Sequence, residues 1–301
     1  MLTDQHVSEV SRHLRDVLEP VAAQVYFSPE AHAAYEALGF GASPGGYQGV
    51  ALPDGPAYFT SRGSCMGQVP GEVVAAAFAV FNPRVVVPAV TFGWSITDAA
   101  TVADARTAGA VAQLERILHD QLDGLDRALA LLRRAAEPLP VAGRPLFSGL
   151  VALGLPGGRL ADMWRTADQL REYRGDSHTA SWLAAGLDAA EVGLLTELWW
   201  GLPMRSYVRS RAWSQDDLDS AESRLRDRGL LQGDGFSQSG SALRSEIELA
   251  TDRQMRPAIE ALGDDVDELL GLLAPWAAAV KAAGGYFPSG PGDLARAAGR
   301  S

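Results

Sequence analysis

One segment, residues 188–235, constrains the fold more than any other part of the chain. Its apolar spacing predicts three short helices in succession: Asp188–Trp200, Pro203–Trp213 and Ser214–Arg228. Ser214 and Asp217 have the spacing of a capping box, in which each side chain accepts a hydrogen bond from the other residue's backbone N–H. The third helix is therefore expected to begin at Ser214.

A turn signal closes this segment. Gly229 should end the third helix, and residues 230–232 followed by Gly233-Asp234-Gly235 predict a short strand and a hairpin turn. Helix, helix, recognition-type helix and β-wing is the winged helix-turn-helix arrangement. The alternative interpretation is an ordinary helical bundle with a loop.

The rest of the chain is also predicted to be mainly α. Apolar residues recur at helical spacing over residues 160–170, and Gly175 is expected to end that helix. Residues 73–94 predict two buried helices joined at Asn82-Pro83, while the Gly/Pro-rich segment 39–63 predicts loops or short strands. Longer amphipathic patterns cover residues 97–136, 239–262 and 264–283.

An internal repeat relates the two halves. A shift of 119 positions aligns these pairs: Gly67 with Gly186, Glu72-Val73 with Glu191-Val192, Trp94-Ser95 with Trp213-Ser214, and Asp98 with Asp217. Ser95 and Asp98 would then repeat the capping box. The pattern predicts tandem winged-helix-like units from a duplication. Residues 1–140 form the degenerate unit, whose third helix runs past Gly109 toward Ala136, and residues 141–301 form the unit with a small β-wing.

The charge balance argues against DNA recognition. The chain has 26 Lys+Arg and 37 Asp+Glu, a formal net charge of -11, and nucleic acid repels such a protein unless basic residues gather on one face. The third helix begins with aspartates at 216, 217 and 219, where a DNA-reading helix carries basic and amide groups, and the wing has no Lys or Arg. The remaining candidates for phosphate contacts are Arg205, Arg209 and Arg211.

Nothing in the sequence indicates a cofactor, a metal or a membrane. Cys65 is the single cysteine, which excludes an internal disulfide and a cysteine-rich zinc site, and a reducing cytoplasm is the expected location. The apolar stretch 73–94 is interrupted by prolines and an arginine, too often for a bilayer span. The motifs of phosphate-binding loops, dinucleotide-binding folds and metalloproteases are missing, so no cofactor and no metal are expected.

Three residues are candidates for ligand contacts or catalysis. Arg62 lies in an apolar stretch, where a guanidinium needs a ligand anion or an internal salt bridge. His178 follows Arg174 and Asp176, a cluster that could orient the imidazole as acid, base or ligand contact, although a capping aspartate beside a hydrogen-bonded histidine is the simpler interpretation. Cys65 is a candidate nucleophile, with a buried small residue as the alternative.

Aromatic residues are candidates for the walls of a pocket. Most have the helical spacing of core residues, but Trp199 and Trp200 point about 100° apart and cannot both face one core. We therefore expect Phe59, Phe81 and Trp200 to surround an apolar ligand at the interface of the halves.

Motifs spread over most of the chain carry a family resemblance: Tyr26-Phe27-Ser28-Pro29-Glu30-Ala31, Tyr58-Phe59-Thr60-Ser61-Arg62, Phe81-Asn82-Pro83, Arg174-Gly175-Asp176-Ser177-His178, Arg224-Leu225-Arg226-Asp227-Arg228-Gly229-Leu230-Leu231 and Leu243-Arg244-Ser245-Glu246-Ile247-Glu248. Through them the chain resembles an actinobacterial family of largely uncharacterised MarR-like winged-helix proteins. The resemblance implies the fold and transfers little function, because that family is named for its fold. Ser64-Cys65 departs from the Ala-Pro that such proteins tend to carry.

These observations predict a ligand-binding protein of MarR-like fold that acts in sensing or sequestration, with weak or no DNA binding. Arg62 would hold an anionic group of the ligand, His178 a polar group, and the aromatic residues its apolar body. Two fused units would imitate the dimer of MarR-like proteins, in a monomer or a homodimer. One alternative is an enzyme of specialised metabolism that uses Cys65 and His178, and another is a DNA-binding transcriptional regulator.

Overall fold

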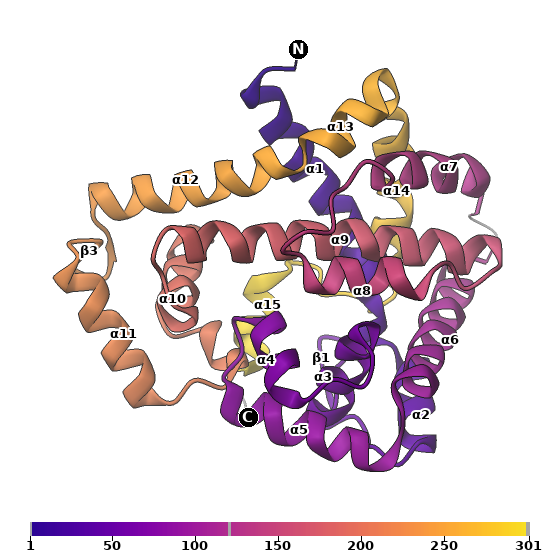
Figure 1. Ribbon diagram of the computed structural model, residues 1–301, viewed down its shortest axis with the longest axis horizontal. Coiled ribbons are helices and arrows are strands. Elements are labelled where there is room, and N and C mark those ends of the chain that lie inside the picture. The colour runs from indigo at the N-terminus through magenta and orange to yellow at the C-terminus, as the bar shows by residue number, and fades with distance from the viewer. Residues whose placement is uncertain (1, 120–121, 299–301) are drawn as a thin grey trace.

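A computed structural model describes residues 2–119 and 122–298 (Figure 1). The mainly α fold is confirmed for this part of the chain. Its β structure consists of two antiparallel hairpins, β1 (Gly46–Tyr47) with β2 (Val50–Ala51) and β3 (Leu231–Gln232) with β4 (Gly235–Phe236). No single helix among the described residues is long and apolar enough to cross a membrane, and one pair, residues 83–96 and 99–118, qualifies only when joined across a 98° bend.

The longest helix, α9 (Arg159–Ala184), runs through the middle of the molecule (Figure 1). Its predicted apolar stripe is confirmed, since Met163, Trp164 and Leu170 are at most 2% exposed. The predicted end at Gly175 is wrong, because the helix continues to Ala184. A glycine inside a helix costs about 1 kcal/mol relative to alanine. Burial of the residues beyond it, Trp182 above all, outweighs that cost.

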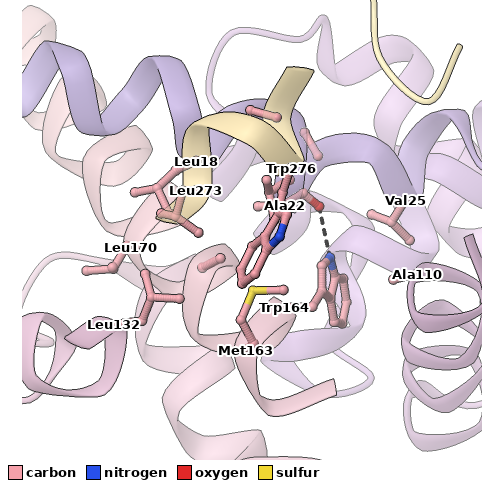
Figure 2. Packing of buried hydrophobic residues seen from close by; sticks show 14 of the residues in the cluster. Leu18, Ala22, Val25, Ala110, Leu132, Met163, Trp164, Leu170, Leu273 and Trp276 are labelled. Carbon is pink, nitrogen blue, oxygen red and sulfur yellow. Dashed lines mark hydrogen bonds between the residues drawn. The ribbon is translucent and has the colours of Figure 1, made fainter. Parts of the chain in front are cut away.

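The largest hydrophobic core surrounds α9 and takes residues from both sides of position 140. Figure 2 shows Met163, Trp164 and Trp276 packed together within it, and the indole N–H of Trp164 donates to the carbonyl oxygen of Ala22 at 3.0 Å. A buried indole N–H needs such an acceptor. The other helical elements around this core are α1 (Asp4–Ala23), η1 (Gln24–Phe27), α2 (Pro29–Ala37), α6 (Ala99–Leu118), α7 (Leu125–Ala136), α13 (Arg256–Leu262), η4 (Gly263–Asp265) and α14 (Val266–Ala282).

A second core packs beside the first. Its elements are α3 (Gly55–Gly63), η2 (Ser64–Met66), α4 (Gly71–Phe78), α5 (Pro83–Ile96) and α8 (Pro145–Leu153). The expectation of loops or strands throughout residues 39–63 is wrong at α3, where Asp54 caps the helix by accepting from the N–H of Ala57 and Pro56 stands in the first turn. The two helices joined at Asn82-Pro83 are confirmed, with Asn82 as the cap of α5.

A third core lies in the C-terminal unit, by which we mean α10 to α12. Its elements are α10 (Ala189–Trp199), η3 (Val208–Arg211), α11 (Gln215–Asp227), the β3–β4 hairpin and α12 (Gln238–Gln254). Ser214 and Asp217 form the predicted capping box at the start of α11, and β3–β4 is the predicted wing. The last helix, α15 (Pro291–Ala298), packs against η3.

The predicted second helix, Pro203–Trp213, is wrong, because only the four residues of η3 are helical. The fully buried carboxylate of Glu197 accepts backbone N–H bonds from Arg205 and Tyr207 at 2.5 Å and from Val208 at 2.6 Å. Backbone N–H groups that bond this carboxylate are not available for the hydrogen bonds of an α-helix, which join each N–H to the carbonyl oxygen four residues earlier. Arg205 also has a positive φ of 66°, which interrupts a right-handed helix.

The predicted capping box at Ser95 and Asp98 is wrong as well. Ser95 lies inside α5 and donates to the carbonyl oxygen three residues earlier, whereas Asp98 is itself the cap of α6. Helix α6 passes Gly109 as expected but is a separate helix from α7. The continuous pattern expected over 97–136 includes residues 120–121, which lie outside the described residues. The duplication, and the division at residue 140, stay predictions.

Candidate functional site

Three adjoining cavities lie between the first two cores and the C-terminal unit. The outer cavity has a volume of about 780 Å³, the aromatic cavity about 540 Å³ and the side cavity about 220 Å³. Tyr207 lines all three. Arg62 is shared by the outer and aromatic cavities, His178 by the aromatic and side cavities, and Trp200 by the outer and side cavities. The three spaces therefore form one system.

The structure brings most of the predicted ligand-binding residues to this system. Phe59, Arg62, Phe81 and His178 all line the aromatic cavity. Trp200 is 39% exposed and lines the other two cavities. Cys65 lines none of the three.

A cluster of four rings forms one wall of the aromatic cavity. Tyr58 and Phe59 come from α3, Phe78 from the end of α4, and Phe81 from the link to α5. Their centroids lie 5.1 to 6.4 Å apart. Arg211 of η3 lies over Phe81, 4.5 Å from the ring centroid. The cavity is therefore apolar on one side and has a cation on the other.

The link between α4 and α5 also holds the C-terminal unit in place. The backbone N–H of Asn82 donates to the carbonyl oxygen of Arg211 at 2.9 Å, and its side-chain amide donates to that of Ala212 at 3.0 Å. The indole N–H of Trp213 donates to the carbonyl oxygen of Val80 at 2.9 Å. These three bonds fix the end of η3 against the aromatic wall.

Arg62 already has a carboxylate partner in the protein. Its Nε and Nη2 donate to the two oxygens of Glu172, both at 2.8 Å, and its Nη1 donates to the hydroxyl of Tyr58 at 3.2 Å. Burial opposes ionisation of Glu172, but the charges of Arg171 and Arg62 outweigh burial and lower its pKa to about 2. The guanidinium that was expected to hold a ligand anion is thus neutralised by a bidentate ion pair.

Arg62 belongs to a buried ion network that sequence reasoning missed. Asp168, which is 0% exposed, accepts from Arg106 at 2.9 Å and from Arg171 at 3.0 Å, and Arg171 also bonds Glu172. The signal was present in the sequence, because Asp168, Arg171 and Glu172 stand in a helix whose apolar residues predict burial. Charges on a buried helix need partners.

Asp176 does not join the other two members of the predicted cluster, Arg174 and His178, which both approach Glu248. Residues two positions apart on a helix point about 200° apart. Arg174 pairs with Asp252 and Glu248, whereas His178 has its Nδ1 3.1 Å from the hydroxyl of Thr251. Burial lowers the pKa of His178 to about 4 despite the nearby carboxylate of Glu248, so the imidazole is neutral at pH 7.

Asp176 caps a different helix. Its carboxylate accepts from the backbone N–H groups of Leu146 and Phe147, at 3.1 and 3.0 Å, in the first turn of α8. Burial raises its pKa to about 7, and the two N–H groups oppose that rise. The capping interpretation, with a hydrogen-bonded histidine nearby, therefore describes the geometry.

Cys65 has the surroundings of a packed core residue. It is 7% exposed, and its Sγ lies 3.4 and 3.8 Å from the carbonyl oxygens of Arg62 and Leu146. Burial raises the pKa of the thiol to about 12, which leaves almost no thiolate at neutral pH. Within the described residues, no group of three His, Cys, Asp or Glu side chains could hold a metal ion.

The surface of α11 carries paired charges. Arg224 bonds Asp188 and Glu191, and Arg226 bonds Glu222 within the helix. Arg228 also approaches Glu191, at 3.6 Å. The acids at the start of the helix remain, so the element that would enter a DNA groove is acidic, as the sequence predicts.

The three arginines considered for DNA contacts lie in different surroundings. Arg205 bonds Asp219 and Glu222 of α11, both at 2.5 Å. Arg211 faces the cavity system. Only Arg209 of the three is exposed. They do not form a continuous basic surface.

Two helices, the turn between them and the following hairpin define a helix-turn-helix protein with a minimal wing, here attached to a larger helical body. The model of a helix-turn-helix family matches residues 11–288, and the chain belongs to that family. The curated proteins and the solved structures give no significant match. The match spans the body as well as the C-terminal unit, and every residue that lines the aromatic and side cavities lies inside the matched range.

Proposed function

We propose that the protein binds a small, largely apolar or aromatic molecule in the aromatic cavity and acts in sensing or sequestration, with weak or no DNA binding. The observation that carries the proposal is the cavity of about 540 Å³ that Phe59, Phe81 and His178 line together. Ligand sites are typically pockets of roughly 300–1,000 Å³ with apolar walls and a few polar groups. The aromatic cavity has both properties.

The position of the cavity supports a sensing role. One wall belongs to the second core, while Tyr207 and Arg211 belong to the C-terminal unit. A molecule in this space would contact both parts. If it binds one arrangement of the two parts more tightly than another, it shifts their populations. Sequestration would need only the binding.

The MarR-like resemblance extends this proposal. In that interpretation the C-terminal unit is a MarR-like winged helix, and the fused halves imitate a dimer around the ligand. The acidic α11 supports a fold that has kept its ligand site and lost most of its attraction to DNA.

Calorimetric titration with a panel of aromatic and polyketide-like compounds tests the proposal. Thr179 lines the aromatic cavity from a half-buried position on α9, so Thr179→Trp should fill the space and abolish binding with little loss of stability. Ala180→Trp is the matched control, because residue 180 is exposed and points about 100° away. Flat titrations across the panel, or unchanged binding by Thr179→Trp, would overturn the proposal.

A DNA-binding regulator is the second candidate, favoured by the complete helix, turn, helix and wing and by the exposed Arg209. Electrophoretic mobility shifts at low salt test it directly, since even non-specific binding should be visible there. We expect no shift at micromolar protein. A shift that Arg209→Gln removes would favour the regulator.

A further inference from the structure

We propose that the side cavity is an anion-binding site that takes one carboxylate- or phosphate-sized group. The existence of the site is argued from its own residues. The identity of what carries the anion rests on the proposed function, because the group would be the charged end of a ligand whose apolar part lies in the aromatic cavity.

The first argument is the charge on the walls. The ionisable residues that line the side cavity are Arg15, Arg174, Arg211, Arg244, His178 and Glu248. Glu248 is shared, since it lies 2.7 Å from Arg244 and 3.3 Å from Arg174. Arg15 and Arg174 also bond Asp16 and Asp252, so the excess positive charge comes from Arg211 and from the incompletely bonded Arg244, in a chain whose formal net charge is -11. Cations concentrated in a cavity of an acidic protein focus the field on a small anion.

The second argument is the incomplete bonding of Arg244. Arg244 is 1% exposed, and its guanidinium lies over Trp199, 5.1 Å from the ring centroid. Its Nη1 contacts Glu248 without hydrogen-bond geometry, and its Nε has no partner within the described parts of the chain. An arginine stays charged in proteins, and an unpaired buried N–H of a charged group is costly. An anion in the side cavity would supply the missing acceptor.

The third argument is the placement of Arg211. It lines both the side cavity and the aromatic cavity, and no carboxylate of the described residues forms an ion pair with it. Its guanidinium lies over Phe81 at 4.5 Å and over Tyr207 at 4.7 Å, and its Nη2 bonds the hydroxyl of Tyr207. These contacts hold a cation at the junction, where the anionic end and the apolar end of one ligand would meet.

The volume fits a group of this size. A water molecule takes about 30 Å³ in the liquid. The side cavity of about 220 Å³ has room for an oxyanion and a few waters, and is too small for the whole of a typical ligand. The hydroxyl of Tyr207 adds a neutral donor that does not repel an anion.

The first test introduces an acid into the site. Thr196 lines the side cavity from a half-buried position of α10. Thr196→Glu should raise the melting temperature by several degrees, because its carboxylate takes the place of the anion, whereas the neutral Thr196→Gln should not. If Thr196→Glu melts at or below Thr196→Gln, the site does not attract anions and the proposal is overturned.

The second test compares charged and neutral probes by calorimetry on the full chain. Inorganic phosphate and the pair benzoate and benzyl alcohol are the probes. We expect benzoate to bind at least tenfold more tightly than benzyl alcohol, and Arg211→Gln to remove that difference. Arg209→Gln, an exposed arginine of the same short helix, is the control and should retain the difference.

The outcomes separate this proposal from the proposed function. Equal binding of benzoate and benzyl alcohol, with no binding of phosphate, would overturn the anion site and leave the apolar pocket standing. Binding of phosphate that depends on Arg211, with no aromatic compound bound, would support the anion site and overturn the proposed function. Phosphate competing with benzoate identifies the ligand's own charged end as the occupant.

Discussion

The exposed surface of α11 and the interior of the side cavity differ in how completely their arginines are paired with carboxylates. On α11, Arg224, Arg226 and Arg228 all face acids, and further acids remain at its start. In the side cavity, Arg211 has no ion pair with a carboxylate of the described residues, and the Nε of Arg244 has no hydrogen-bond partner among them. The side cavity therefore has positive charge that acids do not neutralise, whereas the arginines of the helix that would meet DNA phosphates are paired.

This contrast supports the proposal that a helix-turn-helix fold serves another purpose here. A recognition helix reads DNA with basic and amide side chains near its N-terminus. Here Arg205, from the preceding turn, contacts Asp219 and Glu222 instead. The backbone geometry is retained, and the side chains that would give it a nucleic-acid function are neutralised. Function has to be argued from such sites, because the fold alone does not decide it.

The largest loss of stability should come from removing one member of the buried ion pair of Arg62 and Glu172. An exposed ion pair on α11 serves as the comparison. Glu172→Gln leaves Arg62 and Arg171 facing each other without a carboxylate between them. We expect a loss of about 3–5 kcal/mol in the free energy of unfolding, as when one member of a buried pair is removed. Urea denaturation measures it.

Asp219→Asn on α11 is the matched control. Its carboxylate is 56% exposed, so the loss should be much smaller than at Glu172, because water screens the pair. If the two substitutions cost the same, the buried network contributes no more than a surface pair and the contrast between the regions fails.

The next effect concerns the pH dependence of stability at His178. Its folded pKa of about 4 lies below the ordinary value of 6.5, so the unfolded chain binds a proton that the folded chain does not. The contribution of the neutral imidazole to the free energy of unfolding is complete above pH 6.5 and is lost as the pH falls from 6.5 to 4. With a quarter of the side chain exposed, we expect a loss of about 2 kcal/mol in that window.

Denaturation curves at pH 7 and pH 4.5, for the wild type and His178→Gln, measure this loss. Glutamine can still bond the hydroxyl of Thr251 but does not titrate. The lowered pKa values of Glu172 and Glu248, each about 2, act in the same direction only below about pH 4.5. Equal slopes for the two proteins between pH 6.5 and 4.5 would show that His178 is not desolvated.

The sequence predicts best what short-range contacts determine. The capping box of Ser214 and Asp217 and the turn at Gly233 depend on neighbours within three residues, and both are where the pattern places them. The aromatic residues of the cavity could also be named, because apolar side chains gather wherever helices meet. Neither step requires knowledge of distant partners.

The errors have the opposite cause. Residues 203–213 have a helical pattern, but the carboxylate of Glu197 takes their N–H groups. For Arg62 the sequence left a ligand anion and an internal salt bridge open, and the partner that forms the salt bridge, Glu172, lies 110 positions away in sequence. Arg211 was considered for DNA, but it lines the cavity system, and its carbonyl oxygen accepts from the N–H of Asn82, 129 positions away in sequence. Tertiary hydrogen bonds decided each case, and spacing along one chain does not contain them.

A smaller effect should follow from reversing the charge of α11. Asp216→Lys together with Asp219→Lys adds two cations and releases Arg205 from one of its acids. We expect at least a tenfold gain in non-specific DNA affinity at low salt, read from mobility shifts. Asp126→Lys with Asp267→Lys changes the net charge equally at exposed positions of α7 and α14. A gain as large in this control would show that overall charge, and not the surface of α11, limits DNA binding.

The smallest effect is the loss of stability when the capping box at the start of α11 is removed. Ser214 accepts from the N–H of Asp217 at 3.2 Å, and Asp217 accepts in return from the N–H of Ser214. Ser214→Ala should cost about 1 kcal/mol, the usual loss of a helix cap. Ser95→Ala, at the position that the repeat aligns with Ser214, should cost nothing or stabilise slightly, because Ser95 is an exposed residue inside α5 and alanine is the better helix former. Thermal denaturation of both variants measures the difference. A cost of about 1 kcal/mol at both serines would mean that both cap helices in solution, and would restore the capping box that the repeat predicts for the N-terminal half.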